Sequence, residues 1–481
     1  MSVGTNSDVN SDGLDKNSVG LFHILFQSVT MASPGASLAF SLAVGIAFAG
    51  AVLPLGVLLA LVGCLLVAYS LSQQAKHMPS AGSLFSYANK AYGRRGGFFV
   101  GWAVALYILF FTPAVYLLFP IVVQQVFERD LGLHVGWAPW AILGAITVAA
   151  VSFRGIRFSS AVAMVLGALE IAVFLALSIW MLVVQRHHIS AVPFMPSHAA
   201  VKGFNGVFKA AVFGILAFTG FEAAAALGEE GKNPRRTIPR ALILATVIVG
   251  AFYVICSYAW VIGTGTSSFA KVATSSANPW YDLGSRYWGV GWIAVFLALV
   301  NSVFAVTLAA VNSGSRILFA MSRAGMLPKA ISRIHPKYKT PYVAVLAMSA
   351  WGLAVALLAG WKWGDGVGFG VVATVLTVFA IIAYIAACLG TTIYYRRFQR
   401  DEFNVLRHGV IPILGAVAFA IPLYYQFIPA PAAPLIYANW FCGVVVVVLI
   451  IVTVVGGRAL PAIGTEHMGF DEVEAIDISL D

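Results

Sequence analysis

Residues 214–240 read GILAFTGFEAAAALGEEGKNPRRTIPR, and this stretch decides the fold. An apolar run typical of a membrane helix is interrupted there by Thr219-Gly220 and carries Glu222 just beyond the interruption. A carboxylate at membrane depth costs at least ~2.5 kcal/mol, so by default it indicates a functional site. Non-helical backbone at that depth is tolerated only where it is buried in protein or lines a cavity. The stretch therefore predicts a binding site inside a membrane protein.

The composition of the 481 residues agrees, since 60% are hydrophobic and only 10% are charged. Apolar runs alternate with charged loops, and a run of ~20 residues is long enough for a helix to cross a bilayer. We predict an all-α integral membrane fold with about twelve transmembrane helices. The expected spans are residues 20–46, 51–75, 98–126, 138–152, 160–185, 206–229, 240–264, 287–320, 341–360, 367–394, 409–428 and 433–456.

The distribution of positive charge predicts the orientation in the membrane. Most of the 29 Lys and Arg residues fall in loops that would share a side with the N-terminus. Because such loops stay inside, we expect a multi-pass protein of the cell membrane with both termini cytoplasmic. The net charge of +10 is then explained by the Lys and Arg residues of the cytoplasmic loops, which would also attract anionic lipid. We therefore expect no nucleic-acid partner. These loops are 76–95, 154–157, 232–240, 316–339 and 396–407.

The first expected span is also interrupted, within Ala32-Ser33-Pro34-Gly35-Ala36. A proline kink alone would explain this segment. However, spans one to five and six to ten are similar in length, and each set opens with an interrupted helix, which is typical of an inverted-repeat transporter. Free N–H groups and the positive end of a half-helix dipole suit a carboxylate, and free carbonyl groups suit an ammonium group. A zwitterionic amino acid fits that polarity.

Two glutamates, Glu170 and Glu222, lie deep inside expected spans. Burial disfavours the charged form of a carboxylate, so each side chain could take up and release a proton. The alternative for each is a protonated anchor that only joins helices by hydrogen bonds. Hydroxyl groups of Ser302, Thr307 and Ser313 leave sodium coupling open.

Three separated motifs resemble those of amino acid–polyamine–organocation permeases, which have the LeuT-type fold. The motifs are FTGFEAAAALGEEGKNPRRTIPRA at 218–241, NSGSRILFAMSRAGMLPK at 312–329 with HPKYKTPYVAV at 335–345, and MPSAGSLFSYANKAYG at 78–93. The resemblance covers roughly residues 18–457 and implies a 5+5 inverted repeat followed by two further helices. The chain departs from many members at residues 32–36, where those members have a Gly- and Ser-rich stretch.

The resemblance also implies a division of the chain. We expect a cytoplasmic N-terminal tail, a first repeat, an extracytoplasmic loop, a second repeat, two further helices and an acidic cytoplasmic tail. Their residues are 1–19, 20–185, 186–205, 206–394, 395–457 and 458–481, respectively.

Carried over residue by residue, the resemblance implies alternating access around one central site. Glu222 matches an acidic position linked in some relatives to proton coupling, and Glu170 falls at or near a position where some cationic-amino-acid relatives have Lys. The expected substrate-binding residues are Ala32, Ser33, Gly35, Ala36, Leu216, Ala217, Phe218, Thr219 and Gly220. The expected cytoplasmic gate consists of Glu229, Glu230, Arg236 and Arg316, and the alternative for these four residues is a purely structural clamp.

Other functions fit the sequence less well. The chain contains no HExxH, no GxSxG and no Gly-rich phosphate loop, so we expect no enzyme, no metal set and no cofactor. Within transport, the alternatives are a polyamine permease and an amino acid or metabolite exchanger. A transport-derived nutrient sensor is a further alternative, which only the acidic C-terminus favours.

Overall fold

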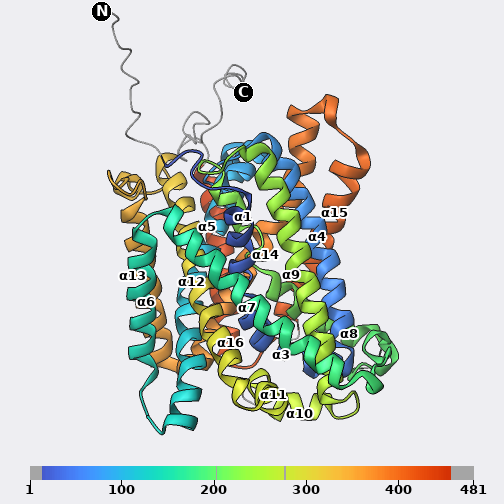
Figure 1. Cartoon of the computed structure of the whole chain (residues 1–481). Helices are drawn as coiled ribbons and strands as arrows, with labels where there is room; N and C mark the ends of the chain where they lie inside the picture. Colours follow the sequence, from blue (N-terminus) through green and yellow to red (C-terminus); the bar gives the residue numbers. More distant parts are fainter. Residues whose placement is uncertain (1–13, 202, 276–277, 429, 457–481) are drawn as a thin grey trace, which may run out of the picture.

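The computed structural model describes residues 14–201, 203–275, 278–428 and 430–456 (Figure 1). The expected tail 458–481 and most of the tail 1–19 lie outside these residues. Within the described part the fold is all-α, as predicted, and its one isolated β-bridge joins Val19 and Gly231.

The first half of the chain begins with an interrupted helix, followed by the long helices α4 and α5. The first expected span is broken into α1, α2, a π-helical turn at Ser37–Ser41 and α3. The helix α5 bends at Gly93, whose φ of 69° is outside the helical range. The helices are α1 (Leu21–Met31), α2 (Pro34–Ala36), α3 (Leu42–Ala49), α4 (Leu53–His77), α5 (Leu84–Leu131), α6 (Trp137–Phe153) and α7 (Ile156–Val184).

The second half opens in the same way, because the sixth expected span is divided into α8 and a 3₁₀ turn at Ala223–Leu227. Two short helices, α10 and α11, which we did not predict, lie across the lower end of the molecule (Figure 1). The helices are α8 (Phe204–Phe218), α9 (Pro234–Thr264), α10 (Phe269–Ser275), α11 (Pro279–Trp288), α12 (Trp292–Arg323), α13 (Tyr342–Trp363), α14 (Asp365–Phe398), α15 (Ile411–Phe427) and α16 (Leu435–Gly456).

The described residues form 10 helical stretches that are long and apolar enough to cross a membrane. One of them, Leu21–His77, has 57 residues and includes α1 to α4, whereas α6 is a shorter apolar helix. The all-α membrane fold is thus confirmed, and the count of twelve spans and the inverted repeat stay predictions.

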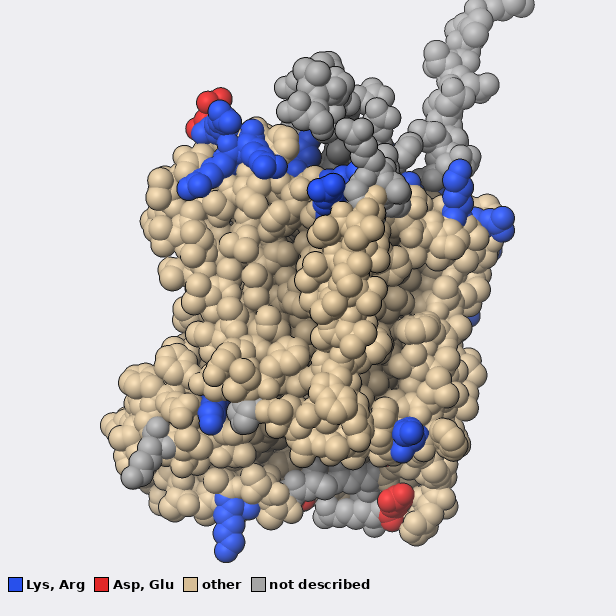
Figure 2. All heavy atoms as spheres, turned by 180° about the vertical axis from the view of Figure 1, so that it is seen from behind, with Lys and Arg blue, Asp and Glu red and all other residues tan. Residues whose placement is uncertain are grey.

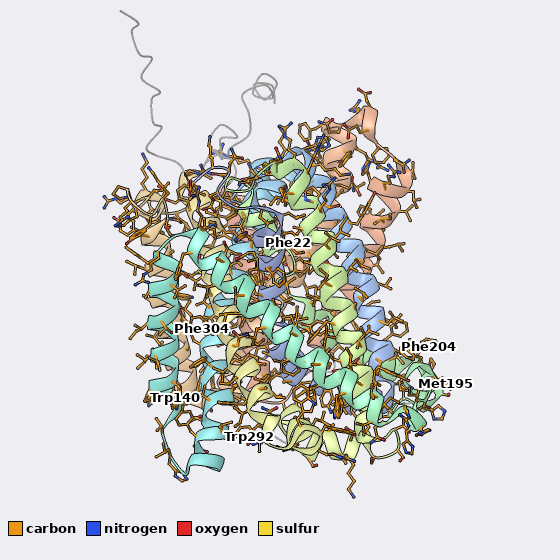
Figure 3. All side chains as sticks on the ribbon, in the orientation of Figure 1. Phe22, Trp140, Met195, Phe204, Trp292 and Phe304 are labelled. Atoms are coloured by element: carbon orange, nitrogen blue, oxygen red, sulfur yellow. The ribbon has the colours of Figure 1, made fainter. Side chains whose placement is uncertain are left out.

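The surface has the character expected of a protein in lipid. On the face seen in Figure 2, Lys and Arg gather at the upper end, and a broad belt below them is nearly free of charged side chains. Large apolar side chains such as Phe22 and Phe204, which are 67% and 58% exposed, point outward (Figure 3). We call the upper end, which includes the loops 78–83, 154–157 and 228–233, the basic end.

Candidate functional site

The first interruption results from a left-handed residue followed by a proline. Ser33 adopts φ 51° and ψ 64°, and Pro34 then begins α2. Pro has no N–H to give and its ring clashes with the preceding turn, so the helix of α1 cannot continue through it. The carbonyl group of Ala32 and the N–H groups of Gly35 and Ala36 are therefore released from regular helical pairing.

The second interruption depends on a glycine. The helix α8 ends at Phe218, Thr219 has ψ 127°, and Gly220 adopts φ 105°. A Cβ atom at Gly220 would lie 2.8 Å from the carbonyl oxygen of Met31. Only glycine tolerates both this backbone and this contact. The backbones of the two interruptions are therefore in contact, which a binding site formed by both of them requires.

A buried tyrosine joins the two interruptions. The hydroxyl group of Tyr253 on α9 lies 2.9 Å from the carbonyl oxygen of Ala32 and 2.9 Å from that of Ala217, and donates to them. Both carbonyls lie near the C-terminal ends of half-helices, where partners on the helix are lacking. The sequence analysis missed Tyr253, because one tyrosine within an apolar helix gives no signal of such a role.

The free N–H groups of the first interruption meet Glu170 and a serine. Ala36 N–H donates to Ser302 Oγ on α12 at 3.0 Å, and Ser302 Oγ lies 3.1 Å from Ser33 Oγ. Gly35 N–H donates to Glu170 Oε2 on α7 at 3.4 Å. Glu170 is fully buried. The predicted proton-coupling residue Glu170 thus lies against the predicted substrate residues 33–36.

Glu222 lies at the second interruption, where two tyrosines hold its carboxylate. Tyr107 of α5 donates to Oε1 at 2.8 Å, and Tyr384 of α14 donates to Oε2 at 2.6 Å. Gly220 N–H donates to the hydroxyl oxygen of Tyr384 at 3.2 Å. A continuous path of hydrogen bonds therefore connects the interrupted backbone at Gly220 to the Glu222 carboxylate.

A small cavity adjoins Glu222 on the side of the basic end. Its volume of about 10 Å³ is near the minimum for one water molecule. Its polar lining comes from Ser83, Tyr107, Glu222 and Ser313, and the remaining walls are apolar. This cavity is therefore far too small to hold a substrate.

The nine predicted substrate residues form two adjacent groups. The residues at 32–36 and 217–220 are buried, and Leu216 is half-buried. The ring of Phe218 packs edge-on against that of Tyr253, with 5.2 Å between the ring centroids. The structure therefore brings these residues together, and their role in binding stays a prediction.

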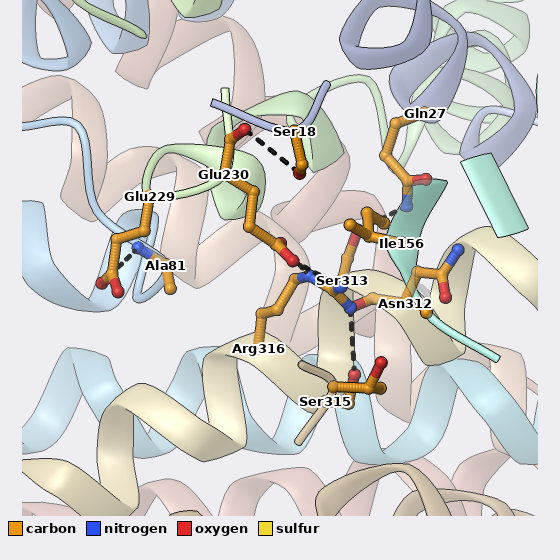
Figure 4. A network of polar contacts seen from close by, with 12 residues as sticks. Ser18, Gln27, Ala81, Ile156, Glu229, Glu230, Asn312, Ser313, Ser315 and Arg316 are labelled. Atoms are coloured by element: carbon orange, nitrogen blue, oxygen red, sulfur yellow. Dashed lines mark hydrogen bonds and ion pairs between the residues drawn. The ribbon is translucent and has the colours of Figure 1, made fainter. Parts of the chain in front are cut away.

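Two of the four predicted gate residues, Glu230 and Arg316, form a buried ion pair, and Glu229 lies nearby with a different partner (Figure 4). Arg316 and Glu230 form an ion pair with both side chains essentially inaccessible to solvent, and Arg316 Nη2 donates to Glu230 Oε1 at 3.0 Å. Glu229 accepts from Ala81 N–H at 3.1 Å and pairs with Arg323, which we did not predict. Arg236 is exposed at the start of α9.

Comparison with known proteins places this arrangement in a family. The family model for amino acid permeases matches residues 23–457. The chain belongs to the amino acid permease family. The permease is 29% identical over 399 residues to a branched-chain amino acid permease of Bacillus subtilis, covering 79% of this chain and 81% of the relative.

Other relatives of the permease are transporters as well. A branched-chain amino acid permease of Lactococcus lactis is 26% identical over 77% of this chain and 81% of its own length. A serine/threonine exchanger of Bacillus subtilis is 27% identical over 75% of this chain and 78% of its own length. The resemblance drawn from the three sequence motifs is thus confirmed, and the permease is a multi-pass membrane protein of a transporter family.

Proposed function

We propose that the permease is a secondary active transporter that moves amino acids across the cytoplasmic membrane by alternating access, coupled to protons. The observation that carries the proposal is the contact between two interrupted membrane helices, at Gly220 and Met31, beside two buried carboxylates. Broken helices at mid-membrane form the binding sites of many secondary transporters. Membership of the amino acid permease family supports the same conclusion.

In this proposal the basic end is cytoplasmic, following the positive-inside rule. The two five-helix repeats are residues 20–185 and 206–394, and residues 395–457 supply the last two helices. The ion pairs formed by Glu229 and Glu230 close the cytoplasmic side, with Arg236 available to them when the gate rearranges.

The substrate is a neutral amino acid in this proposal. Its carboxylate binds the N–H groups at Gly35 and Ala36, and its ammonium group binds the carbonyl groups at the interruptions. Ala217 and Phe218 offer apolar surface to a side chain, which agrees with the branched-chain substrates in the names of two relatives. A polyamine would need several free carboxylate oxygen atoms, whereas both oxygen atoms of Glu222 already accept hydrogen bonds and only Oε1 of Glu170 is without a partner among the described residues.

Proton coupling follows from competition at one N–H group. Glu170 Oε2 accepts the N–H of Gly35, the group that a substrate carboxylate would also use. A bound carboxylate would leave Glu170 without this partner and beside a second negative charge, and both effects favour protonation of Glu170. By linkage, a proton on Glu170 then strengthens substrate binding by the same factor.

Uptake by the purified protein in liposomes tests the function. Radiolabelled leucine, serine, arginine and putrescine are supplied with an inward pH gradient and without sodium. The proposal expects leucine to accumulate and the accumulation to collapse on addition of a protonophore. Uptake of putrescine alone would favour the polyamine permease, and transport only into preloaded liposomes would favour the exchanger. Absence of any transport would favour the nutrient sensor.

A further inference from the structure

Residues 14–20 cross the basic end of the molecule before α1 begins. The N–H groups of Ser18 and Val19 donate to the carbonyl oxygen of Glu230 at 2.9 and 3.2 Å, and Lys232 N–H donates to the carbonyl oxygen of Val19 at 2.9 Å. This is the isolated β-bridge between Val19 and Gly231. The segment is thus fixed by its backbone to the loop that follows the second interruption, and the Ser18 hydroxyl group adds a contact to the Glu230 carbonyl oxygen at 3.4 Å (Figure 4).

Leu14 anchors the other end of this segment. Its side chain is only 5% exposed and packs with Ala81, Phe319 and Ile334. Ala81 belongs to the loop between α4 and α5, and Phe319 belongs to α12. A leucine seven residues before the first membrane helix thus occupies an apolar pocket formed by other parts of the chain.

An ion pair adds a third attachment. Asp15 Oδ2 lies 3.1 Å from Arg157 Nε at the start of α7, and the two side chains are 35% and 68% exposed. Exposed pairs of this kind contribute little to an equilibrium. The buried Leu14 side chain and the backbone hydrogen bonds therefore dominate the attachment.

Two of the residues that contact Leu14 lie on the same segments as residues of the small cavity beside Glu222. Ser83 and Ile317 line that cavity, whereas Ala81, two residues before Ser83, and Phe319, two residues after Ile317, pack against Leu14. The N–H of Ala81 also donates to Glu229, next to the buried Glu230–Arg316 pair. Residues 14–19 therefore hold together, from outside, the elements that separate the site from the basic end.

We propose that residues 14–19 are a latch that keeps the transport path closed at the basic end, and that the path opens there only when Leu14 leaves its pocket. The inference rests on the proposed function in that it assumes alternating access. The latch adds a control point outside the substrate site, since any change that releases Leu14 shifts the protein toward the state open at this end.

Thiol accessibility of the path tests the latch. Ala226 lines the cavity beside Glu222 and is buried, so a cysteine introduced by Ala226→Cys reports opening through its rate of labelling by a water-soluble maleimide. Labelling of the same protein without Ala226→Cys gives the background rate, which should be low because its described cysteines are all buried. Leu14→Ala is expected to raise the labelling rate about tenfold, the factor given by losing most of one buried leucine side chain.

Three further variants distinguish release of the latch from misfolding. Lys16→Ala is the matched control, because Lys16 is exposed within the same segment, and it should leave the rate unchanged. Asp15→Arg should raise the rate by about fivefold at most, because an exposed pair contributes no more than ~1 kcal/mol, and adding Arg157→Asp should restore the rate. An unchanged rate in Leu14→Ala would overturn the latch.

The latch and the proposed function can fail separately. A protein that transports amino acids but shows no effect of Leu14→Ala retains the function and loses the latch. A protein that transports none of the tested compounds but shows the tenfold change retains the latch and loses the proposed substrate class.

Discussion

Removal of one hydroxyl group, in Tyr253→Phe, should separate the two interruptions that form the site. The oxygen atom of this hydroxyl lies 2.9 Å from the carbonyl oxygens of both Ala32 and Ala217. Ala32 O keeps a second donor, since Ser37 Oγ donates to it at 2.9 Å. The substitution therefore leaves mainly the carbonyl group of Ala217 without its hydroxyl partner, in a region sealed from solvent.

A buried polar group that loses its partner costs ~1–3 kcal/mol. If substrate binds only when the two interruptions keep the relative position that Tyr253 gives them, the loss of this free energy weakens substrate affinity by about 5- to 150-fold. We expect the KM for amino acid uptake to rise within that range, and the stabilisation of the protein by substrate in thermal unfolding to fall.

Tyr258→Phe is the matched control on the same helix. Its hydroxyl group donates to the carbonyl oxygen of Ser190 at 3.0 Å, away from the interruptions. This variant should lose some thermal stability and keep its KM. An unchanged KM in a folded Tyr253→Phe protein would refute the role assigned to Tyr253.

Three further substitutions have distinct expected outcomes. Glu222→Gln should abolish pH-driven uptake in liposomes while the protein still folds, because the side chain can no longer exchange a proton, and the exposed Glu128→Gln should not. Gly220→Leu should eliminate substrate binding measured by thermal shift, since even the Cβ atom of the new side chain would collide with the backbone of the first interruption. Its control is Gly364→Leu, because Gly364 also has a positive φ, 78°, but has open space around it. Arg316→Met should lower the free energy of unfolding by ~3–5 kcal/mol in denaturant titrations, because it leaves a buried carboxylate unpaired. A loss below about 1 kcal/mol there would mean that the pair is open to water.

The sequence predicted the membrane helices because lipid requires long apolar runs, and such runs are visible without any tertiary contact. The interruptions at Pro34 and Gly220 were predictable for the same reason, since helix-breaking residues are costly in lipid. The short helices α10 and α11 were not, because segments of 7 and 10 residues are too short to show the apolar run of a membrane span. The structure interrupts the expected span 287–320 near its start, since α11 ends at Trp288 and α12 begins at Trp292.

The partners within the site were less predictable. Glu170 and Glu222 are conspicuous as buried charges, whereas the backbone group that contacts Glu170, the N–H of Gly35, comes from a distant part of the chain. The charge pattern indicated an acidic and basic cluster near residue 230, yet it did not identify Arg323 as the partner of Glu229. Pairing across 94 residues depends on helix packing, which hydropathy does not encode.

Proton movement during transport tests the central claim most directly. The purified protein is placed in liposomes that enclose a pH-sensitive dye, without sodium, and external leucine is added at equal pH on both sides. The account predicts acidification of the interior that follows leucine entry and is lost in Glu170→Gln and Glu222→Gln. Leucine entry with no change in internal pH would contradict proton coupling.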